Sequence, residues 1–124
     1  MVNEICIDSD IIINLLKGNQ ETADNMNSMD AVYVTTAINS FEIWTERKDK
    51  ENIKSLLESM KILEFNKQSS LIAGNIRKKL SEEGKIIDIK DIFIASICIY
   101  YHVPLLTANK THFSRLTKFG LQLI

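Results

Sequence analysis

Short runs of apolar and β-branched residues alternate along the chain with longer stretches in which apolar residues recur every three or four positions. The short runs predict strands at residues 4–8, 31–35, 61–65 and 104–107, with a further candidate at 121–124. The longer stretches predict helices at residues 11–17, 21–29, 51–60, 69–83 and 91–101, and one that begins at Asn39 or Ser40 and reaches Glu46. The predicted strands and helices therefore alternate along the chain.

This alternation predicts an α/β fold with a mainly parallel sheet that helices cover on both faces. The segment at 91–101, DIFIASICIYY, is so apolar that we expect its helix to be central and buried. In parallel sheets, ligands bind beyond the carboxyl ends of the strands. The polar residues that follow the predicted strands are thus the first candidates for a site: Asp8, Asp10, Thr35, Thr36, Thr107 and Asn109.

Composition narrows the class of protein. The 124 residues suit one compact domain, and with 45% hydrophobic residues and a net charge of −1 the chain is predicted to fold rather than stay disordered. A chain without a broad positive field would bind nucleic acid through a local patch or through metal ions. Cys6 and Cys98 lie in apolar runs without metal-ligand spacing, which predicts buried thiols. No segment resembles a membrane span or a signal peptide, so we expect a cytoplasmic protein.

The segment ICIDSDIIIN places two acids where a strand ends and a helix begins. Asp8 follows a run of buried isoleucines, where a carboxylate needs a partner or a cation, so we expect Asp8 to be functional. Its alternative role is to cap the following helix. Asp10 falls in the first turn of that helix, where the helix dipole favours an acid, and we interpret it as serving the helix start.

Two further acids come from other elements. Glu42 lies among apolar neighbours in TTAINSFEIWTE, whereas Glu46 begins a plain charged run. Asp91 starts the apolar helix, although Asp88 could provide its cap. If Asp8, Glu42 and Asp91 converge, their mutual repulsion calls for a cation, and oxygen ligands favour Mg²⁺ or Mn²⁺. Such ions support phosphodiester hydrolysis.

Three segments together resemble the PIN-domain ribonucleases, especially the VapC-type toxins of toxin–antitoxin pairs. IDSDIIINLLKG is similar to the family's opening motif, with Asp8 as its first acid, and VTTAINSFEIW is similar to the segment that carries its glutamate, here Glu42. The most specific match is GKIIDIKDIFIASICIYYHVPLLTANKTHF, with Asp91 as the third acid. That segment ends in a signature formed by Thr107, Asn109 and Phe113.

The resemblance implies that residues 1–124 form a single PIN domain, a three-layer α/β/α fold. It implies a Mg²⁺- or Mn²⁺-dependent endoribonuclease, with RNA as substrate, a cognate antitoxin that blocks the site, and a homodimer. Asp8 and Asp91 would be the main metal ligands, and Glu42 would complete the cluster or position the attacking water. The remaining site-lining residues would be Ser9, Thr107 and Asn109. Lys110, beside the last of these, is our candidate for a phosphate contact.

The sequence departs from the family pattern in its last motif, where many relatives place a fourth acid. Asn109 and His112 occupy the matching positions, and neither is acidic. With one negative charge fewer, we expect weaker binding of a second metal ion. One alternative is therefore a catalytically weakened PIN-like domain that binds RNA or acts as a scaffold. Another is a haloacid-dehalogenase-type phosphatase, in which Asp8 would be the nucleophile and Asp10 the general acid.

Overall fold

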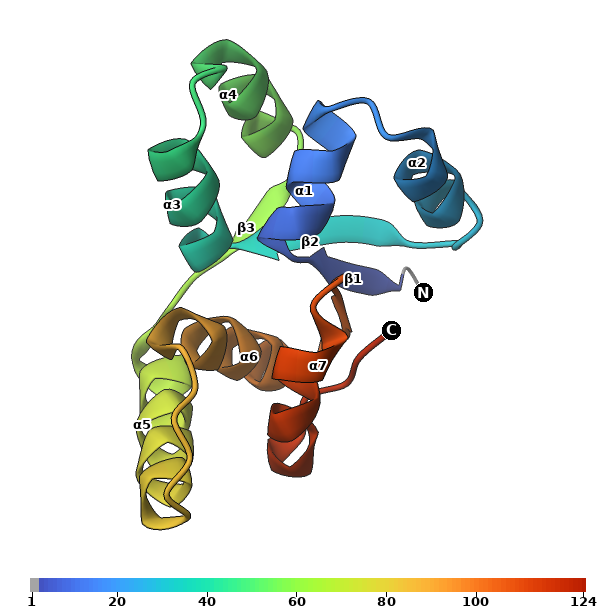
Figure 1. Cartoon of the computed structure of the whole chain (residues 1–124). Helices are drawn as coiled ribbons and strands as arrows, with labels where there is room; N and C mark the ends of the chain where they lie inside the picture. The colour runs from blue at the N-terminus through green and yellow to red at the C-terminus, as the bar shows by residue number, and fades with distance from the viewer. Residues whose placement is uncertain (1–2) are drawn as a thin grey trace.

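The central sheet has four parallel strands in the order β3-β2-β1-β4 (Figure 1). It is seen in a computed structural model, which describes residues 3–124. The strands are β1 (Glu4–Ile7), β2 (Val32–Thr36), β3 (Lys61–Leu63) and β4 (Leu105–Leu106). The predicted α/β fold with a parallel sheet is confirmed. The candidate strand at 121–124 is reduced to a single bridge between Leu123 and Leu105.

Seven α-helices and one 3₁₀ helix occupy the described residues. They are α1 (Ser9–Leu16), α2 (Gln20–Asn27), α3 (Ala37–Glu46), α4 (Lys50–Glu58), α5 (Lys67–Glu82), α6 (Ile89–Tyr101), α7 (Lys110–Phe113) and η1 (Ser114–Phe119). The predicted start of α3 was wrong. Thr36 caps this helix by accepting a hydrogen bond from the backbone nitrogen of Asn39, so Asn39 lies inside the first turn. Helices α7 and η1 were not predicted.

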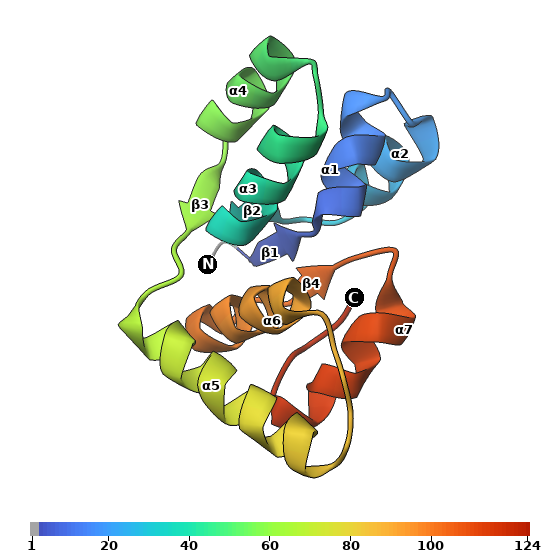
Figure 2. The same ribbon diagram turned by 60° about the vertical axis from the view of Figure 1, so that its left-hand side comes forward.

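Helices α1–α4 lie on one side of the sheet and α5, α6 and the carboxyl-terminal helices on the other (Figures 1 and 2), and a hydrophobic core lies on each side. One core joins the sheet to α1–α4 and includes Ile7, Ile12 and Ile43. The other joins the sheet to α5, α6 and the carboxyl-terminal helices. Side chains on a strand point alternately to the two faces, which places Cys6 in the second core beside the apolar residues of α6. The three-layer arrangement is thus confirmed.

Helix α6 is the buried centre of its layer, as its apolar sequence predicts. Six of its residues are buried, and Cys98 and Cys6 are free, buried thiols. Among residues 3–124, no helix combines the length and the apolar character that crossing a membrane requires. The amino end of α6 lies at the same edge of the sheet as the carboxyl ends of β1, β2 and β4 (Figure 2). Side chains from these four elements therefore define one region.

Candidate active site

Asp8 lies at the carboxyl end of β1 and is 7% exposed. Its Oδ1 accepts hydrogen bonds from the backbone nitrogen of Ser9 at 2.8 Å and from Nδ2 of Asn39 at 2.9 Å. Its Oδ2 accepts from Oγ1 of Thr107 at 2.7 Å. Asp8 thus caps α1, but it also ties together β1, α3 and the segment after β4. A cap alone needs only the first of these contacts, so the hydrogen bonds of Asp8 go beyond helix capping.

Asn39 is the member of this network that the sequence did not identify. It is completely buried, and its Nδ2 donates to both Asp8 and Oγ of Ser9, each at 2.9 Å. Its Oδ1 accepts from Oγ1 of Thr36 at 2.7 Å. Because this amide is held in one orientation, its hydrogen bond goes to Oδ1 of Asp8, which then accepts two hydrogen bonds. Asn39 therefore positions the carboxylate at the centre of the site.

We expect Asn39→Ala to lower the free energy of unfolding by about 2 kcal/mol. The truncation leaves the carboxylate of Asp8 and the hydroxyls of Ser9 and Thr36 short of buried partners. Urea denaturation followed by circular dichroism measures the effect. Asn75→Ala, on the exposed face of α5, is the matched control and should change stability by less than about 0.5 kcal/mol. Equal midpoints for the two variants would show that the Asn39 network contributes nothing.

Glu42 lies on α3 and reaches the same region through Ser9. Oγ of Ser9 donates to Oε1 of Glu42 at 2.8 Å, and Nζ of Lys90 lies 3.6 Å from Oε2. Burial raises the pKa of Glu42, and the hydrogen bond from Ser9 and the charge of Lys90 offset part of that rise. The structure thus connects Asp8, Ser9 and Glu42, which the sequence proposed as site residues.

Asp91 lies in the first turn of α6, and its side chain is free for a role other than capping. Asp88 is the cap, since its Oδ1 accepts from the backbone nitrogen of Lys90 at 2.9 Å. Burial, followed by the charges of Asp88, Asp8 and Glu42, raises the pKa of Asp91 to about 6. Mutual repulsion that reaches Asp8 and Glu42 places all three predicted acids in one electrostatic cluster.

Asp10 does more than start the helix, so our interpretation of it was incomplete. Its Oδ2 accepts from the backbone nitrogen of Ala108 at 3.1 Å and faces Oγ1 of Thr107 at 3.4 Å. Its Oδ1 is buried and has no hydrogen-bond partner among the described residues. Burial and the charge of Asp8 raise the pKa of Asp10. Asp10 therefore joins α1 to the segment after β4 and adds a fourth carboxylate to the region.

The last motif splits into a buried and an exposed part. Thr107 is 2% exposed, donates to Asp8, and accepts from the backbone nitrogen of Asn109 at 3.0 Å. The side chain of Asn109 is exposed and its Nδ2 lies 3.0 Å from Nδ1 of His112. Lys110 is exposed and forms no ion pair with the residues that the structure describes. Thr107 thus belongs to the network, whereas Asn109 and Lys110 lie at its rim.

Two other candidates from the sequence do not face the site. Thr35 and Thr36 are completely buried; Oγ1 of Thr35 donates to the carbonyl oxygen of Ile7 at 2.8 Å, and Thr36 caps α3. The hydroxyl of Thr36 also donates to Oδ1 of Asn39 at 2.7 Å. Thr35 therefore holds the strands together, whereas Thr36 holds α3 and the amide of Asn39 in place.

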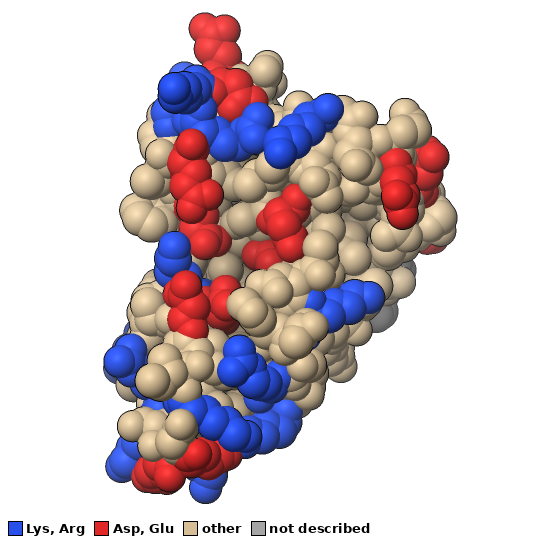
Figure 3. Space-filling model, viewed as in Figure 1, with Lys and Arg blue, Asp and Glu red and all other residues tan. Residues whose placement is uncertain are grey.

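The surface view shows how the charges are distributed around the site. Acidic side chains gather around a hollow in the middle of the face, between the upper and lower groups of helices, and basic side chains lie on both sides of it (Figure 3). Among residues 3–124, however, no three His, Cys, Asp or Glu side chains are arranged to hold one metal ion. The carboxylates are close enough to repel one another but are engaged with Ser9, Asn39, Thr107 and Lys90 instead.

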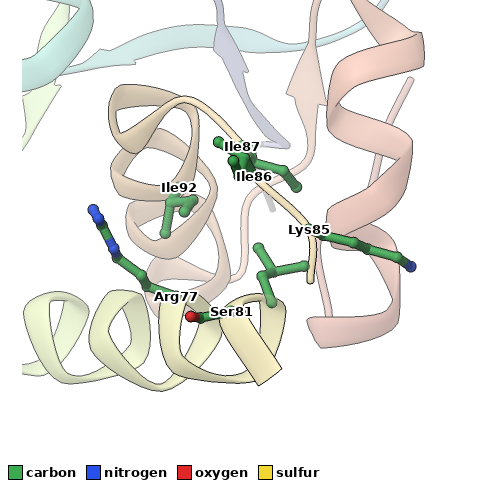
Figure 4. A pocket seen from close by; sticks show the side chains of 7 residues that line it. Arg77, Ser81, Lys85, Ile86, Ile87 and Ile92 are labelled. Atoms are coloured by element: carbon green, nitrogen blue, oxygen red, sulfur yellow. The ribbon is translucent and has the colours of Figure 1, made fainter. Parts of the chain in front are cut away.

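A separate cavity of about 110 Å³ lies between α5 and the start of α6. Figure 4 shows that Arg77 and Lys85, which line it, direct their charged ends to opposite sides, away from each other. The rest of the lining is mainly apolar and includes the buried Ile87 and Ile92. Without converging polar groups, this cavity is a gap in packing rather than a second site.

The fold and the site define an α/β protein with a carboxylate cluster at the carboxyl edge of a parallel sheet. Residues 5–118 match the family model of the PIN domain. The chain belongs to the PIN domain family, which confirms the resemblance seen in the sequence.

Individual relatives agree with this assignment. The chain is 42% identical over 91 residues to Ribonuclease VapC3 of Methanocaldococcus jannaschii, a match that covers 73% of this chain and 94% of that protein. Its fold is similar to that in the structure of VapBC2 from Rickettsia felis bound to a DNA fragment from their promoter, with a TM-score of 0.80, 22% identity, and coverage of 98% and 97% of the two chains. It is also similar to VapBC-1 from nontypeable Haemophilus influenzae, with a TM-score of 0.81, 24% identity, and coverage of 98% and 96%.

Proposed function

We propose that this protein is a metal-dependent endoribonuclease that hydrolyses RNA phosphodiester bonds, acting in the cytoplasm as the toxin of a toxin–antitoxin pair. The observation that carries the proposal is the cluster formed by Asp8, Glu42 and Asp91 from three separate elements. A relative with 42% identity bears the name Ribonuclease VapC3, and the same three acids are those that the family resemblance identified. The haloacid-dehalogenase alternative has no comparable support.

The donor chemistry fits Mg²⁺ or Mn²⁺, since every candidate ligand is an oxygen. A carboxylate has about four lone-pair positions. Asp8 uses two of them on Oδ1 and one on Oδ2, which leaves Oδ2 able to bind a cation. A pKa of about 6 leaves Asp91 charged at neutral pH and repelled by its neighbours, a strain that a cation would relieve. Oδ1 of Asp10, which is buried and has no hydrogen-bond partner among residues 3–124, adds to the negative charge of the site.

Asp8 and Asp91 would hold the ion, and Glu42 would complete the set once its side chain shifts from Ser9 and Lys90. The bound ion would activate a water molecule and stabilise the negative charge that develops on the phosphate. Asn39 and Thr107 hold the carboxylate of Asp8 in one orientation.

Other residues of the chain would act on the substrate from the rim of the site. Lys110, exposed beside the last motif, supplies positive charge for an RNA phosphate. Asn109 would line the site together with its neighbour His112.

The proposal is tested by incubating the purified protein with total cellular RNA in Mg²⁺, in Mn²⁺ and in EDTA. We expect discrete fragments in either metal and intact RNA in EDTA, because the carboxylate cluster needs a cation to act on a phosphate. Sequencing the new RNA ends identifies the target. Identical fragment patterns with and without EDTA would contradict metal-dependent hydrolysis by this site.

A non-catalytic RNA-binding or scaffold domain is the second candidate, and two observations favour it. Neither Asn109 nor His112 is acidic, although the family pattern implies an acid at one of these positions, and the described carboxylates are not arranged as a ready-made metal site. Isothermal titration with Mn²⁺ separates the candidates, because a scaffold has no need of the ion. Absent Mn²⁺ binding, together with intact RNA, would favour the scaffold.

The proposed partners are an antitoxin and a second copy of the chain. Structures with the same fold include VapBC toxin–antitoxin complexes, which supports an antitoxin partner. Phe41 and Trp44 on α3 are 60% and 44% exposed, and paired copies would cover these apolar rings. Light scattering after gel filtration tests the homodimer, and co-purification with the protein of the adjacent reading frame tests the antitoxin. A protein that is monomeric in solution would contradict the homodimer, and one that does not co-purify with the neighbouring protein would contradict the antitoxin partner.

A further inference from the structure

A groove of about 680 Å³ lies directly beside the carboxylate cluster, between α1, α2 and the segment that follows β4. Its wall nearest the cluster is formed by Thr107, Ala108 and Lys110. Thr107 donates to Asp8 and Ala108 donates to Asp10, so this wall is shared with the candidate active site. A polymer whose phosphate lies at the carboxylates would therefore continue into the groove. Its volume falls within the range of ~300–1,000 Å³ that is typical of ligand sites.

The other side of the groove is rich in uncharged polar side chains. Asn14 of α1 and Asn19, Thr22 and Asn25 of α2 line it. Oδ1 of Asn19 caps α2 by accepting from the backbone nitrogen of Thr22 at 2.9 Å. The side-chain amides of Asn14 and Asn25 make no hydrogen bond within the part of the chain that the structure describes. These two amides are therefore free to bind a ligand.

The two sides of the groove carry opposite charges. Lys110 lines the side nearest the cluster, and Glu21 is on the α2 side. A phosphate backbone would be attracted by the lysine and repelled by the glutamate. The sugar–phosphate chain would thus follow the Lys110 side, which turns the bases toward the amides of α1 and α2.

We propose that this groove binds single-stranded RNA next to the scissile phosphate and that Asn14 and Asn25 read the bases there. The inference rests on the proposed ribonuclease function and assigns its sequence preference to the groove. An amide has both a donor and an acceptor, which match the edges of unstacked bases. The apolar lining residues Ile11 and Leu106 are only 7% and 5% exposed, so a bound base would contact mainly the polar side chains of the groove.

The lining favours RNA over a protein segment. Peptides that dock in grooves as helices place apolar anchors in apolar pockets. Here most of the lining residues are polar or charged, and the large apolar ones, Ile11 and Leu106, are almost fully covered. A hydrogen-bonding ligand with exposed edges fits this surface better than an amphipathic helix.

The test uses the double variant Asn14→Ala/Asn25→Ala with Asn75→Ala as control. Both groove positions are inside helices, where alanine is the better helix former, so the variant is expected to fold. Each protein cuts a pool of random-sequence single-stranded RNA in Mg²⁺, and the bases flanking each cut are sequenced. We expect the double variant to lose the base preference on one side of the cut and to show a KM raised about tenfold, with kcat nearly unchanged.

A second readout does not depend on cleavage. In ¹⁵N-labelled protein, the side-chain amide resonances of Asn14 and Asn25 should shift on addition of oligo(A), oligo(C) or oligo(U), in Ca²⁺ and in EDTA. The amide resonance of Asn75 should stay in place. Two experiments thus report on the same groove, one through activity and one through contact.

The possible outcomes distinguish a failure of the groove inference from a failure of the proposed ribonuclease function. If the wild type cuts RNA and the double variant keeps its KM and base preference, the groove inference is wrong and the proposed function stands. If the wild type cuts nothing but the two amides shift, the groove binds RNA in a non-catalytic protein. If the amides respond only to a co-expressed partner protein, the groove belongs to that protein and not to RNA.

Discussion

Asp8→Asn is expected to reduce metal-dependent RNA cleavage by about a thousandfold. A bound divalent ion contributes several kcal/mol of transition-state stabilisation, and about 4 kcal/mol corresponds to that factor. The variant replaces a carboxylate oxygen by an NH₂ group, which either turns toward Nδ2 of Asn39 or faces the hydroxyl of Thr107. The substitution removes negative charge and the acceptor that holds the network together. Initial rates on the RNA target in Mg²⁺ measure the loss.

The same geometry makes a control of folding necessary. An amide donor that faces another donor is expected to lower the free energy of unfolding by about 1–3 kcal/mol. Thermal denaturation shows whether Asp8→Asn is folded at the assay temperature. Asp30→Asn, an exposed change of the same chemistry, should keep both activity and melting temperature. A folded Asp8→Asn variant that cleaves at the wild-type rate would exclude Asp8 as a metal ligand.

Asp8 could be selected as a candidate from the sequence alone because the residues that make it unusual are its neighbours in the chain. An acid directly after buried isoleucines at the end of a strand has few structural explanations. In a parallel sheet, that position lies at the edge where ligands bind. The order of strands and helices likewise follows from the spacing of apolar residues, which is why the fold was predicted correctly. The assignment of Asp8, Glu42 and Asp91 to metal binding stays a prediction, supported by their convergence.

The roles of Asn39 and Asp10 could not be predicted from the residues next to them in the sequence. An asparagine near a helix start looks like a cap, and only the folded chain shows that Thr36 takes that role and frees Asn39 to bind Asp8. Asp10 likewise satisfies the helix dipole, and its contact with Ala108 joins residues that are 98 positions apart. Neither partner is encoded by spacing or propensity, because both arise when separate strands meet at one edge.

The carboxyl-terminal segment illustrates the same limit in secondary structure. Leu121 to Ile124 are apolar enough for a strand, but within the described chain they form a single bridge to the sheet, between Leu123 and Leu105. Strand β4 itself has just two residues, so it offers its neighbour a short edge. Strand length depends on the partner as well as on propensity, and a single segment's pattern cannot supply it.

Asp91→Asn is expected to yield a protein that is inactive yet more stable than the wild type in EDTA. Burial and neighbouring acids raise the pKa of Asp91 to about 6 from the 3.8 of an unperturbed aspartate. The folded state therefore disfavours the carboxylate, and the stability that the protonated form provides is lost as pH rises from about 4 through about 6. At about pH 7.5 the asparagine avoids this penalty of about 1 kcal/mol, a figure that allows for solvent screening of a half-buried group.

The matching measurement is a pair of melting curves at two pH values, with and without Mg²⁺. In EDTA at about pH 7.5, the variant should melt about 4 °C above the wild type, and at about pH 4 the difference should vanish because Asp91 is then protonated. Mg²⁺ should raise the melting temperature of the wild type but not of the variant, since only the wild type binds it. The affinity of the wild type for Mg²⁺ should decline as pH falls through about 6, because protons then compete with the ion for Asp91. A variant that melts below the wild type at about pH 7.5, or that still cleaves RNA, would show that Asp91 stabilises the fold instead of serving the metal site.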